Sequence, residues 1–128
     1  MKLLLDTHAF IWWANEPDRL SNAALNACQD RGNTLALSVA SVWEMQIKMQ
    51  LGKLKINRPL NVLVKEQQQV NELQVMPVEL AHVLGLDSLP LHHKDPFDRL
   101  LVAQANLEGF TLVSADVALS SYAVHLLW

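Results

Sequence analysis

Acidic residues recur along this chain at the points where a short apolar run gives way to a helical segment. Runs of strand length that alternate with helical segments predict an α/β fold, with a mainly parallel sheet covered by helices on both faces. The carboxyl ends of parallel strands share one edge of such a sheet, and ligands bind at that edge. The sequence therefore predicts that four carboxylates meet there: Asp6, Glu44, Asp98 and Asp116.

Such a cluster needs its negative charge to be offset. Carboxylates at one edge would repel each other by about 4 kcal/mol per close pair, even at an effective dielectric constant near 20. Mg²⁺ and Mn²⁺ prefer hard oxygen ligands and keep several waters, so a few carboxylates suffice to hold one ion. The pattern therefore indicates a site for Mg²⁺ or Mn²⁺, which can activate a water and polarise a phosphorus–oxygen bond.

Each acid also has a structural explanation. Asp6, Asp95 and Asp116 are placed to cap the helices that follow them. Asp98 would then lie in a first helical turn, where the helix dipole favours an acid. Glu44 fits this explanation less well, because it lies within a helix between apolar neighbours. The shared position of the acids at one edge favours a site over a set of unrelated caps.

Size and composition predict one domain over residues 1–128. The chain has 128 residues, 51% of them hydrophobic, which is enough for a core without disulfides. The single cysteine, Cys28, has no partner within the chain, and this favours a reducing, cytoplasmic location. Asp6 interrupts the apolar N-terminus too early for a signal peptide. No apolar stretch reaches the length of a membrane span, so no membrane partner is expected.

The secondary structure can be predicted from periodicity, caps and breakers. We expect strands at residues 2–5, 34–37, 74–77, 111–114 and 124–128. We expect helices at residues 8–14, 21–31, 38–52, 61–74, 78–86 and 95–108, and a helical turn at 116–120. Gly32 is the expected end of the second helix, and Ser38 or Ser41 the expected start of the third.

The net charge of −3 argues against a general nucleic-acid coat protein, but the basic residues are unevenly distributed. Half of them fall in one stretch without an acid: Lys48, Lys53, Lys55, Arg58 and Lys65. A solvated helix end and loop would explain this stretch equally well. Its functional interpretation is a positive rim that holds a phosphodiester backbone beside the acidic site.

Several other classes of site are disfavoured. The chain has no Walker A loop and no glycine-rich dinucleotide fingerprint. Cys28 has no evident activating partner, so a cysteine nucleophile is not expected. His92 and His93 are adjacent, their side chains diverge, and no second Cys or His group gives a zinc-like spacing. We therefore assign no metal to His92 or His93, while His8, two residues after Asp6, either reaches the cleft or packs beneath the sheet.

Four segments, taken in order and spacing, resemble a PIN-domain ribonuclease of the VapC toxin type, and the resemblance covers nearly the whole chain. They are Leu-Leu-Asp-Thr-His at 4–8, Ser-Val-Ala-Ser-Val-Trp-Glu at 38–44, His-Lys-Asp-Pro-Phe-Asp-Arg-Leu-Leu-Val-Ala-Gln-Ala at 93–105 and Leu-Val-Ser-Ala-Asp at 112–116. The resemblance implies a three-layer α/β/α domain that carries a Mg²⁺- or Mn²⁺-dependent endoribonuclease site.

The resemblance also assigns residues. The catalytic acids of the family fall on Asp6, Glu44, Asp98 and Asp116, and the metal ligands on Asp6 and Asp98. Thr7 and Ser114 fall on supporting positions, although many relatives have Thr where this chain has Ser114. Asp98 rather than Asp95 matches the family pattern, which leaves Asp95 as the cap.

Proteins of this type form homodimers, act on RNA, and are silenced by a cognate antitoxin whose tail occupies the active-site groove. Trp12 and Trp13 on an early helix suit an interface or equally an ordinary core. The residues expected to contact RNA or an acidic antitoxin tail are Lys48, Lys53, Lys55 and Arg58.

Two other functions fit parts of the pattern. Asp6 after the first strand suits an aspartyl-phosphate phosphotransfer enzyme, but His8 stands where such enzymes often carry a second Asp. A catalytically inert PIN-like interaction module is the second alternative, and the complete set of acids argues against it.

Overall fold

A five-stranded parallel sheet forms the centre of the molecule, in a computed structural model that describes residues 1–128. The strand order is β3-β2-β1-β4-β5. The strands are β1 (Lys2–Leu5), β2 (Thr34–Ser38), β3 (Gln74–Met76), β4 (Thr111–Val113) and β5 (Leu126–Leu127). Every pair of neighbours is parallel, which confirms the predicted α/β class with a mainly parallel sheet.

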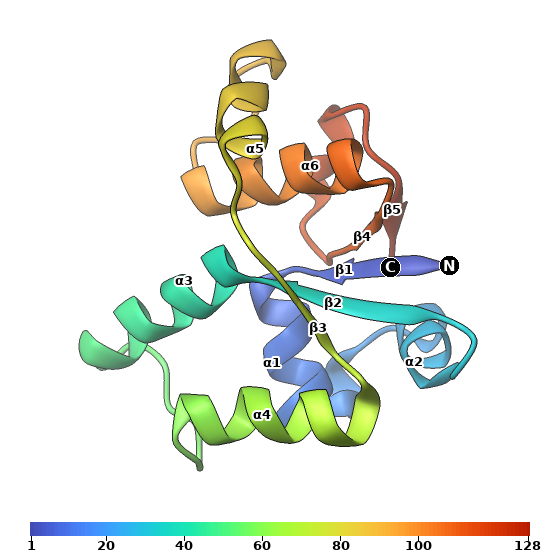
Figure 1. Ribbon diagram of the computed structural model, residues 1–128, viewed down its shortest axis with the longest axis vertical. Coiled ribbons are helices and arrows are strands. Elements are labelled where there is room, and N and C mark those ends of the chain that lie inside the picture. The colour runs from blue at the N-terminus through green and yellow to red at the C-terminus, as the bar shows by residue number, and fades with distance from the viewer.

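Helices cover both faces of the sheet (Figure 1). Helices α5 and α6 lie on one side, and α1, α2 and α4 lie on the other, while α3 extends from the carboxyl end of β2. The helices are α1 (Thr7–Asn15), α2 (Asn22–Gln29), α3 (Val39–Gln50), α4 (Leu60–Asn71), α5 (Leu80–Leu84) and α6 (Pro96–Glu108). Short 3₁₀ turns follow α1, α5 and β4: η1 (Pro17–Arg19), η2 (Gly85–Ser88) and η3 (Val117–Ser121).

Strand β1 shows how the two layers are built. Its side chains alternate between the faces of the sheet, and all three leucines are fully buried. Leu3 and Leu5 belong to the core formed with α1, α2, α3 and α4. Leu4 belongs to the second core, which contains Leu101 and Val102 of α6. After the exposed Lys2, the central strand contains only leucines until its carboxyl end, where Asp6 follows.

The expected caps begin the helices that frame this edge. Ser21, Ser38 and Asp95 cap α2, α3 and α6 through their side-chain oxygens, and Gly109 ends α6 in the left-handed conformation. Ser41 does not cap a helix, because its buried hydroxyl lies inside α3 without a hydrogen-bond partner. The caps fix where each helix starts relative to the strand before it.

Helix ends were predicted less well than helix starts. Helix α2 ends at Gln29 rather than near Arg31, because Asp30 accepts the Gly32 N–H and closes a side-chain turn that competes with the helix. Helix α4 stops at Asn71, since Glu72 takes a left-handed conformation with φ of 55°.

Three other boundaries also differ. Helix α3 ends at Gln50, two residues before Gly52, and the residues predicted as one helix at 78–86 form α5 followed by η2. Strand β5 contains two residues, because it pairs only with Leu112 and Val113 of the short strand β4. No helix of this chain combines the length and the apolar character needed to cross a bilayer.

Candidate active site

Each of the four predicted acids lies at or just beyond the carboxyl end of a strand, or in a helix that starts there. Asp6 directly follows β1 and caps α1, where its Oδ1 accepts the Ala9 N–H at 2.8 Å. Glu44 lies in α3, which follows β2, and Asp116 lies between β4 and η3, which it caps. Asp98 occupies the first turn of α6, whose N-terminus points toward the same edge.

Glu44 is neutralised by its own surroundings. The Thr7 hydroxyl donates to Glu44 Oε1 at 2.7 Å, and Lys48 Nζ lies 2.7 Å from Oε2. Lys48 is one helical turn beyond Glu44, a spacing that places both side chains on one face of α3. Both carboxylate oxygens of this buried residue therefore have a partner.

Asp98 and Asp116 share a single partner, His93. His93 Nε2 lies 3.2 Å from Asp98 Oδ2 and 2.9 Å from Asp116 Oδ2. We call Asp98 and Asp116 the histidine-bridged acids, and His93 is the residue that bridges them. The other oxygen of Asp116 accepts the Ala118 N–H at 2.9 Å. The bridge brings α6, the loop before it and the segment after β4 to one point.

Ser114 connects this group to Asp6. The buried Ser114 Oγ accepts the Asp116 N–H at 3.1 Å. The side chain of Ser114 also hydrogen-bonds to Asp6 and favours the ionised form of that carboxyl. Both predicted supporting residues thus contact the acids, Thr7 through Glu44 and Ser114 through Asp6 and Asp116.

Electrostatic strain is concentrated on Asp98. Burial, and after it the charges of three other carboxylates, together raise the pKa of Asp98 to about 7. The three carboxylates are Asp95, Asp6 and Glu44, while His93 acts in the opposite direction. The pKa of Asp6 is also raised, mainly by burial and in part by Glu44. The negative charge around Asp98 is therefore only partly offset by the protein itself.

Asp116 and His93 shift in the directions expected of a hydrogen-bonded pair. The hydrogen bond from His93 lowers the pKa of Asp116. The same bond raises the pKa of His93, with help from the charges of Asp98, Asp116 and Asp95. A second proton on the ring would nevertheless cost a bond, because His93 Nδ1 accepts the Asp95 N–H at 3.1 Å.

The donor set at this edge fits a hard divalent cation. Oxygens of Asp98 and Asp116 and a ring nitrogen of His93 lie within 4.8 Å of one another, so one ion could reach both carboxylates. Asp6 is close enough to Asp98 to raise its pKa. Carboxylate oxygens are the ligands that Mg²⁺ and Mn²⁺ prefer, and a cation beside Asp98 would offset the charge of the acids that raise its pKa.

His93 is the residue that sequence reasoning missed. The adjacent histidines do diverge, as expected, since His92 packs edge-on against Tyr122 with ring centroids 5.2 Å apart. Because the two side chains diverge, only His93 contacts the acids. A single histidine has no zinc-like sequence spacing by which it could be recognised. The available signal was its position two residues before Asp95, which closes a small loop back onto the ring.

The basic residues divide into two groups. Lys48, Lys53 and Lys55 line one groove of about 590 Å³, together with His8 and Trp12. Lys48 also lines a smaller pocket with Glu44 and Asp95, so it connects the groove to the acids. Arg58 is engaged by Glu66 of α4 in an ion pair, and its charge is already offset.

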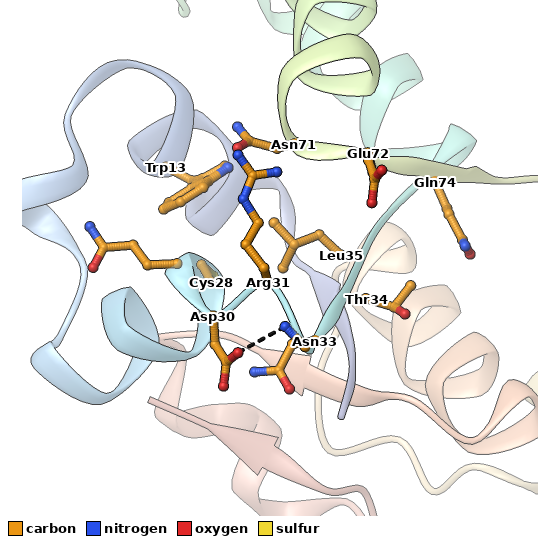
Figure 2. A pocket seen from close by; sticks show the side chains of 12 residues that line it. Trp13, Cys28, Asp30, Arg31, Asn33, Thr34, Leu35, Asn71, Glu72 and Gln74 are labelled. Carbon is orange, nitrogen blue, oxygen red and sulfur yellow. Dashed lines mark hydrogen bonds between the residues drawn. The ribbon is translucent and has the colours of Figure 1, made fainter.

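A polar pocket of about 350 Å³ lies at the opposite edge of the sheet (Figure 2). Thr34 and Gln74, the first residues of β2 and β3, line it, and none of the four acids does. Cys28 also lines this pocket, and burial raises the pKa of its thiol to about 11. The thiol is therefore protonated at neutral pH, which agrees with the prediction that it is not a nucleophile.

Comparison with known proteins gives consistent results. Residues 3–124 match the PIN domain family. Ribonuclease VapC22 of Mycobacterium tuberculosis is 33% identical over 122 residues, which cover 94% of this chain and 91% of that protein. The fold resembles that of VapBC2 from Rickettsia felis, solved with a DNA fragment from its promoter. That likeness has a TM-score of 0.75 at 17% identity and covers 99% of this chain and 98% of the other.

A second solved structure agrees. FitAcB from Neisseria gonorrhoeae superposes with a TM-score of 0.63 at 17% identity, over 98% of this chain and 96% of that one. At such identity the two structures support the fold alone, and they confirm the predicted three-layer architecture. The family match includes all four acids and most of the chain, and the chain belongs to the PIN domain family.

Proposed function

We propose that this protein is a Mg²⁺- or Mn²⁺-dependent endoribonuclease that cleaves RNA phosphodiester bonds, and that it is the toxin of a toxin–antitoxin pair. Its catalytic acids are Asp6, Glu44, Asp98 and Asp116, with the cation held by Asp6 and Asp98. The similarity to a protein named ribonuclease VapC22 supports this proposal over most of the chain.

The observation that carries the proposal is the grouping of the acids at the carboxyl edge of the sheet, where Asp98 and Asp116 lie 3.2 and 2.9 Å from one imidazole nitrogen and the pKa of Asp98 is raised to about 7. A carboxyl in the first turn of a helix is normally favoured in its ionised form by the helix dipole. Here burial and neighbouring acids outweigh that effect, so the folded protein keeps an acidic position that its own groups do not neutralise. Perturbed carboxyls grouped in this way at a strand edge are typical of catalytic sites.

The residues divide the chemical work between them. A bound Mg²⁺ or Mn²⁺ would lower the pKa of a water and polarise the scissile phosphorus–oxygen bond. Asp6, at the end of β1, and Asp98, in the first turn of α6, would hold that cation. Thr7 and Lys48 fix the orientation of Glu44, and Glu44 would accept a proton from the attacking water only after it releases one of these two partners.

The basic groove is proposed to hold the RNA backbone. Lys48, Lys53 and Lys55 line it, and Lys48 extends it to the acids. Ammonium groups bind phosphates without reading the base, so these residues position the strand across the scissile bond. Arg58 is paired with Glu66 and Lys48 with Glu44, so each would have to share or leave its carboxylate in order to contact RNA or an antitoxin.

The proposed protein partner is a cognate antitoxin. The neighbours of this fold include VapBC2 and FitAcB. An acidic antitoxin tail in the basic groove would compete directly with RNA, since both would use the same lysines.

A second copy of the chain is the other proposed partner. Helices α3 and α6, with the segment around α5, form an apolar groove of about 680 Å³. Trp43 in this groove is 62% exposed. Phe97 lines the groove and also the pocket beside Glu44, so a second copy would border the acidic site.

The proposed dimer can be tested by measuring the oligomeric state of the protein and of two variants. Trp43→Arg should convert a dimer into a monomer in sedimentation velocity, because it places a charge inside an apolar interface. Leu51→Arg is the matched control, since Leu51 is equally exposed and lies outside the groove. A monomeric wild-type protein, or equal effects of the two variants, would contradict a dimer through this groove.

An aspartyl-phosphate mechanism is less well supported. Asp6 is 5% exposed, and its Oδ1 is engaged by the Ala9 N–H. A nucleophilic carboxylate must reach the incoming phosphorus, and this environment restricts it. Beryllofluoride should therefore form no adduct at Asp6.

The test of the function is cleavage of total cellular RNA by antitoxin-free protein in Mg²⁺, Mn²⁺ or EDTA. Asp98→Asn should lower the rate by more than about a hundredfold, because even an outer partner of a metal ligand is worth 10–100-fold. Asp87→Asn removes an exposed acid and is the matched control. Metal-independent cleavage, or full activity of Asp98→Asn, would overturn the site and its chemistry.

A further inference from the structure

The ring of His93 is fixed in place from several sides. Its Nδ1 accepts the Asp95 N–H at 3.1 Å, and its own backbone N–H donates to the Tyr122 hydroxyl at 3.0 Å. Tyr122 is buried in the core shared with α6, so it anchors the loop that carries His93. The ring therefore approaches the acids with Nε2 foremost and has little freedom to turn.

The bond at Nδ1 determines which nitrogen carries the proton. A nitrogen that accepts an N–H must offer a lone pair, so the proton of the neutral ring is on Nε2. That N–H donates to Asp116 Oδ2 at 2.9 Å, and Asp98 Oδ2 lies 3.2 Å from the same nitrogen. A protonated nitrogen cannot ligate a cation. Ligation through Nε2 would move the proton to Nδ1, where it would face the Asp95 N–H, donor against donor.

The contacts of the Asp98 and Asp116 carboxylate oxygens indicate the role of His93. Asp116 is held at Oδ1 by the Ala118 N–H and at Oδ2 by His93. Asp98 Oδ2 lies 3.2 Å from the same His93 nitrogen, in an electrostatic contact that is longer than the bond to Asp116. Hydrogen bonds of this kind orient ligating carboxylates before the metal arrives.

We propose that His93 is a positioning residue, which holds Asp98 and Asp116 together for the cation through its Nε2–H and is not itself a ligand. The inference rests on the proposed function for the identity of the site. Its test uses the cation alone, so that it is independent of RNA cleavage.

Two substitutions separate the two nitrogens of the ring. His93→Asn keeps an acceptor near the Nδ1 position for the Asp95 N–H, and it removes the donor to the acids. His93→Gln places an amide N–H near the Nε2 position, and it loses the acceptor. His92→Asn is the control, because the same change one residue away affects only the packing on Tyr122.

Mn²⁺ binding to the full chain, measured by electron paramagnetic resonance of the free ion, gives the result. His93→Asn should weaken Mn²⁺ binding by about 10–100-fold, the usual effect of losing an outer partner of a ligand. His93→Gln and His92→Asn should bind within about threefold of the wild-type protein, as expected of changes that keep the donor. Mg²⁺, measured by competition, should lose affinity by the same factor, since no nitrogen ligand is involved.

A spectroscopic readout does not depend on how the variants fold. Electron spin-echo modulation of the Mn²⁺ complex of the wild-type protein should show no directly coordinated ¹⁴N. A nitrogen coupling lost in both variants would make His93 a ligand and overturn the inference. Unchanged or tighter Mn²⁺ binding by His93→Asn would also overturn it, as would a wild-type protein that binds no Mn²⁺. Wild-type protein that binds Mn²⁺ but cleaves no RNA would instead refute the proposed function alone.

Discussion

The acidic edge of this protein has two halves that differ in how their charge is offset. On one side, Glu44 is paired with Lys48 and accepts the Thr7 hydroxyl, so the chain supplies its own cation. On the other side, Asp98 shares one imidazole with Asp116, and its pKa is about 7. The difference indicates where an external cation belongs: on the Asp98 side, with Asp6 between the halves.

The largest expected effect comes from removing the unbalanced charge. Asp98→Asn should stabilise the metal-free protein at pH 8 by a few kcal/mol, since a raised pKa of about 7 makes ionisation unfavourable in the folded state. In thermal unfolding with EDTA, the melting temperature should rise by roughly 5–10 °C. Asp87→Asn should leave it unchanged, and a lower melting temperature for Asp98→Asn would mean that its carboxylate is well satisfied.

The wild-type protein should show the same effect as a pH dependence. The pKa of Asp98 is about 7 when folded and about 3.9 when unfolded. Between these values the folded state binds more protons, so the free energy of unfolding falls as pH rises from about 4 to about 7. The raised pKa values of Asp6 and His93 act in the same direction. The lowered pKa of Asp116 acts oppositely, but only as pH falls below about 4.

Thermal unfolding from pH 4.5 to 8 in EDTA measures this slope. Saturating Mn²⁺ should remove most of the fall above pH 6, because the ion replaces the proton at Asp98. Stability that rises with pH in EDTA would contradict the account of this half.

In the half of the acidic edge that contains Glu44, the ion pair can be removed by substitution of Lys48. Lys48→Met should cost about 1–2 kcal/mol of stability, less than the loss of a fully buried partner, since Lys48 is 34% exposed. It should also weaken RNA binding and lower the salt dependence by about one phosphate contact. Lys65→Met on the exposed surface of α4 is the control. Equal salt slopes for the two variants would remove Lys48 from the RNA path.

The smallest effect is expected at Thr7. Thr7→Val removes the hydroxyl that donates to Glu44 while it keeps the shape, and it should cost about 1 kcal/mol. Lys48 still neutralises Glu44, so Mn²⁺ affinity should change by less than about threefold, as for a group outside the metal's coordination. A larger loss of Mn²⁺ affinity would place the cation at Glu44 and reverse the comparison between the halves.

The sequence predicted the strands, the parallel sheet and the residues that frame the edge, because these depend on local signals. Asp6 after an apolar run and Asp95 before Pro96 are examples, and both cap helices as expected. His93 could not be predicted, because its position depends on a loop held by Tyr122, 29 residues away. The pairing of Arg58 with Glu66 was missed for a similar reason, since the helix α4 turns Glu66 back toward the loop.

Helix ends were harder to predict than helix starts, and the cause is local competition. Asp30 and Glu72 end their helices through a side-chain turn and a left-handed conformation. Asp and Glu are not residues that usually end helices. The end of α2 was therefore predicted at Gly32, because glycine is the usual residue at that position.

The central claim, that the cation belongs to the Asp98 half, is tested most directly by locating it. Crystals soaked in Mn²⁺ should show one strong anomalous peak at Asp98 and Asp6, near Asp116, with Lys48 still paired to Glu44 and His93 outside the coordination sphere. A peak at Glu44 that displaces Lys48 would contradict the account, and so would the absence of any peak at the acidic edge.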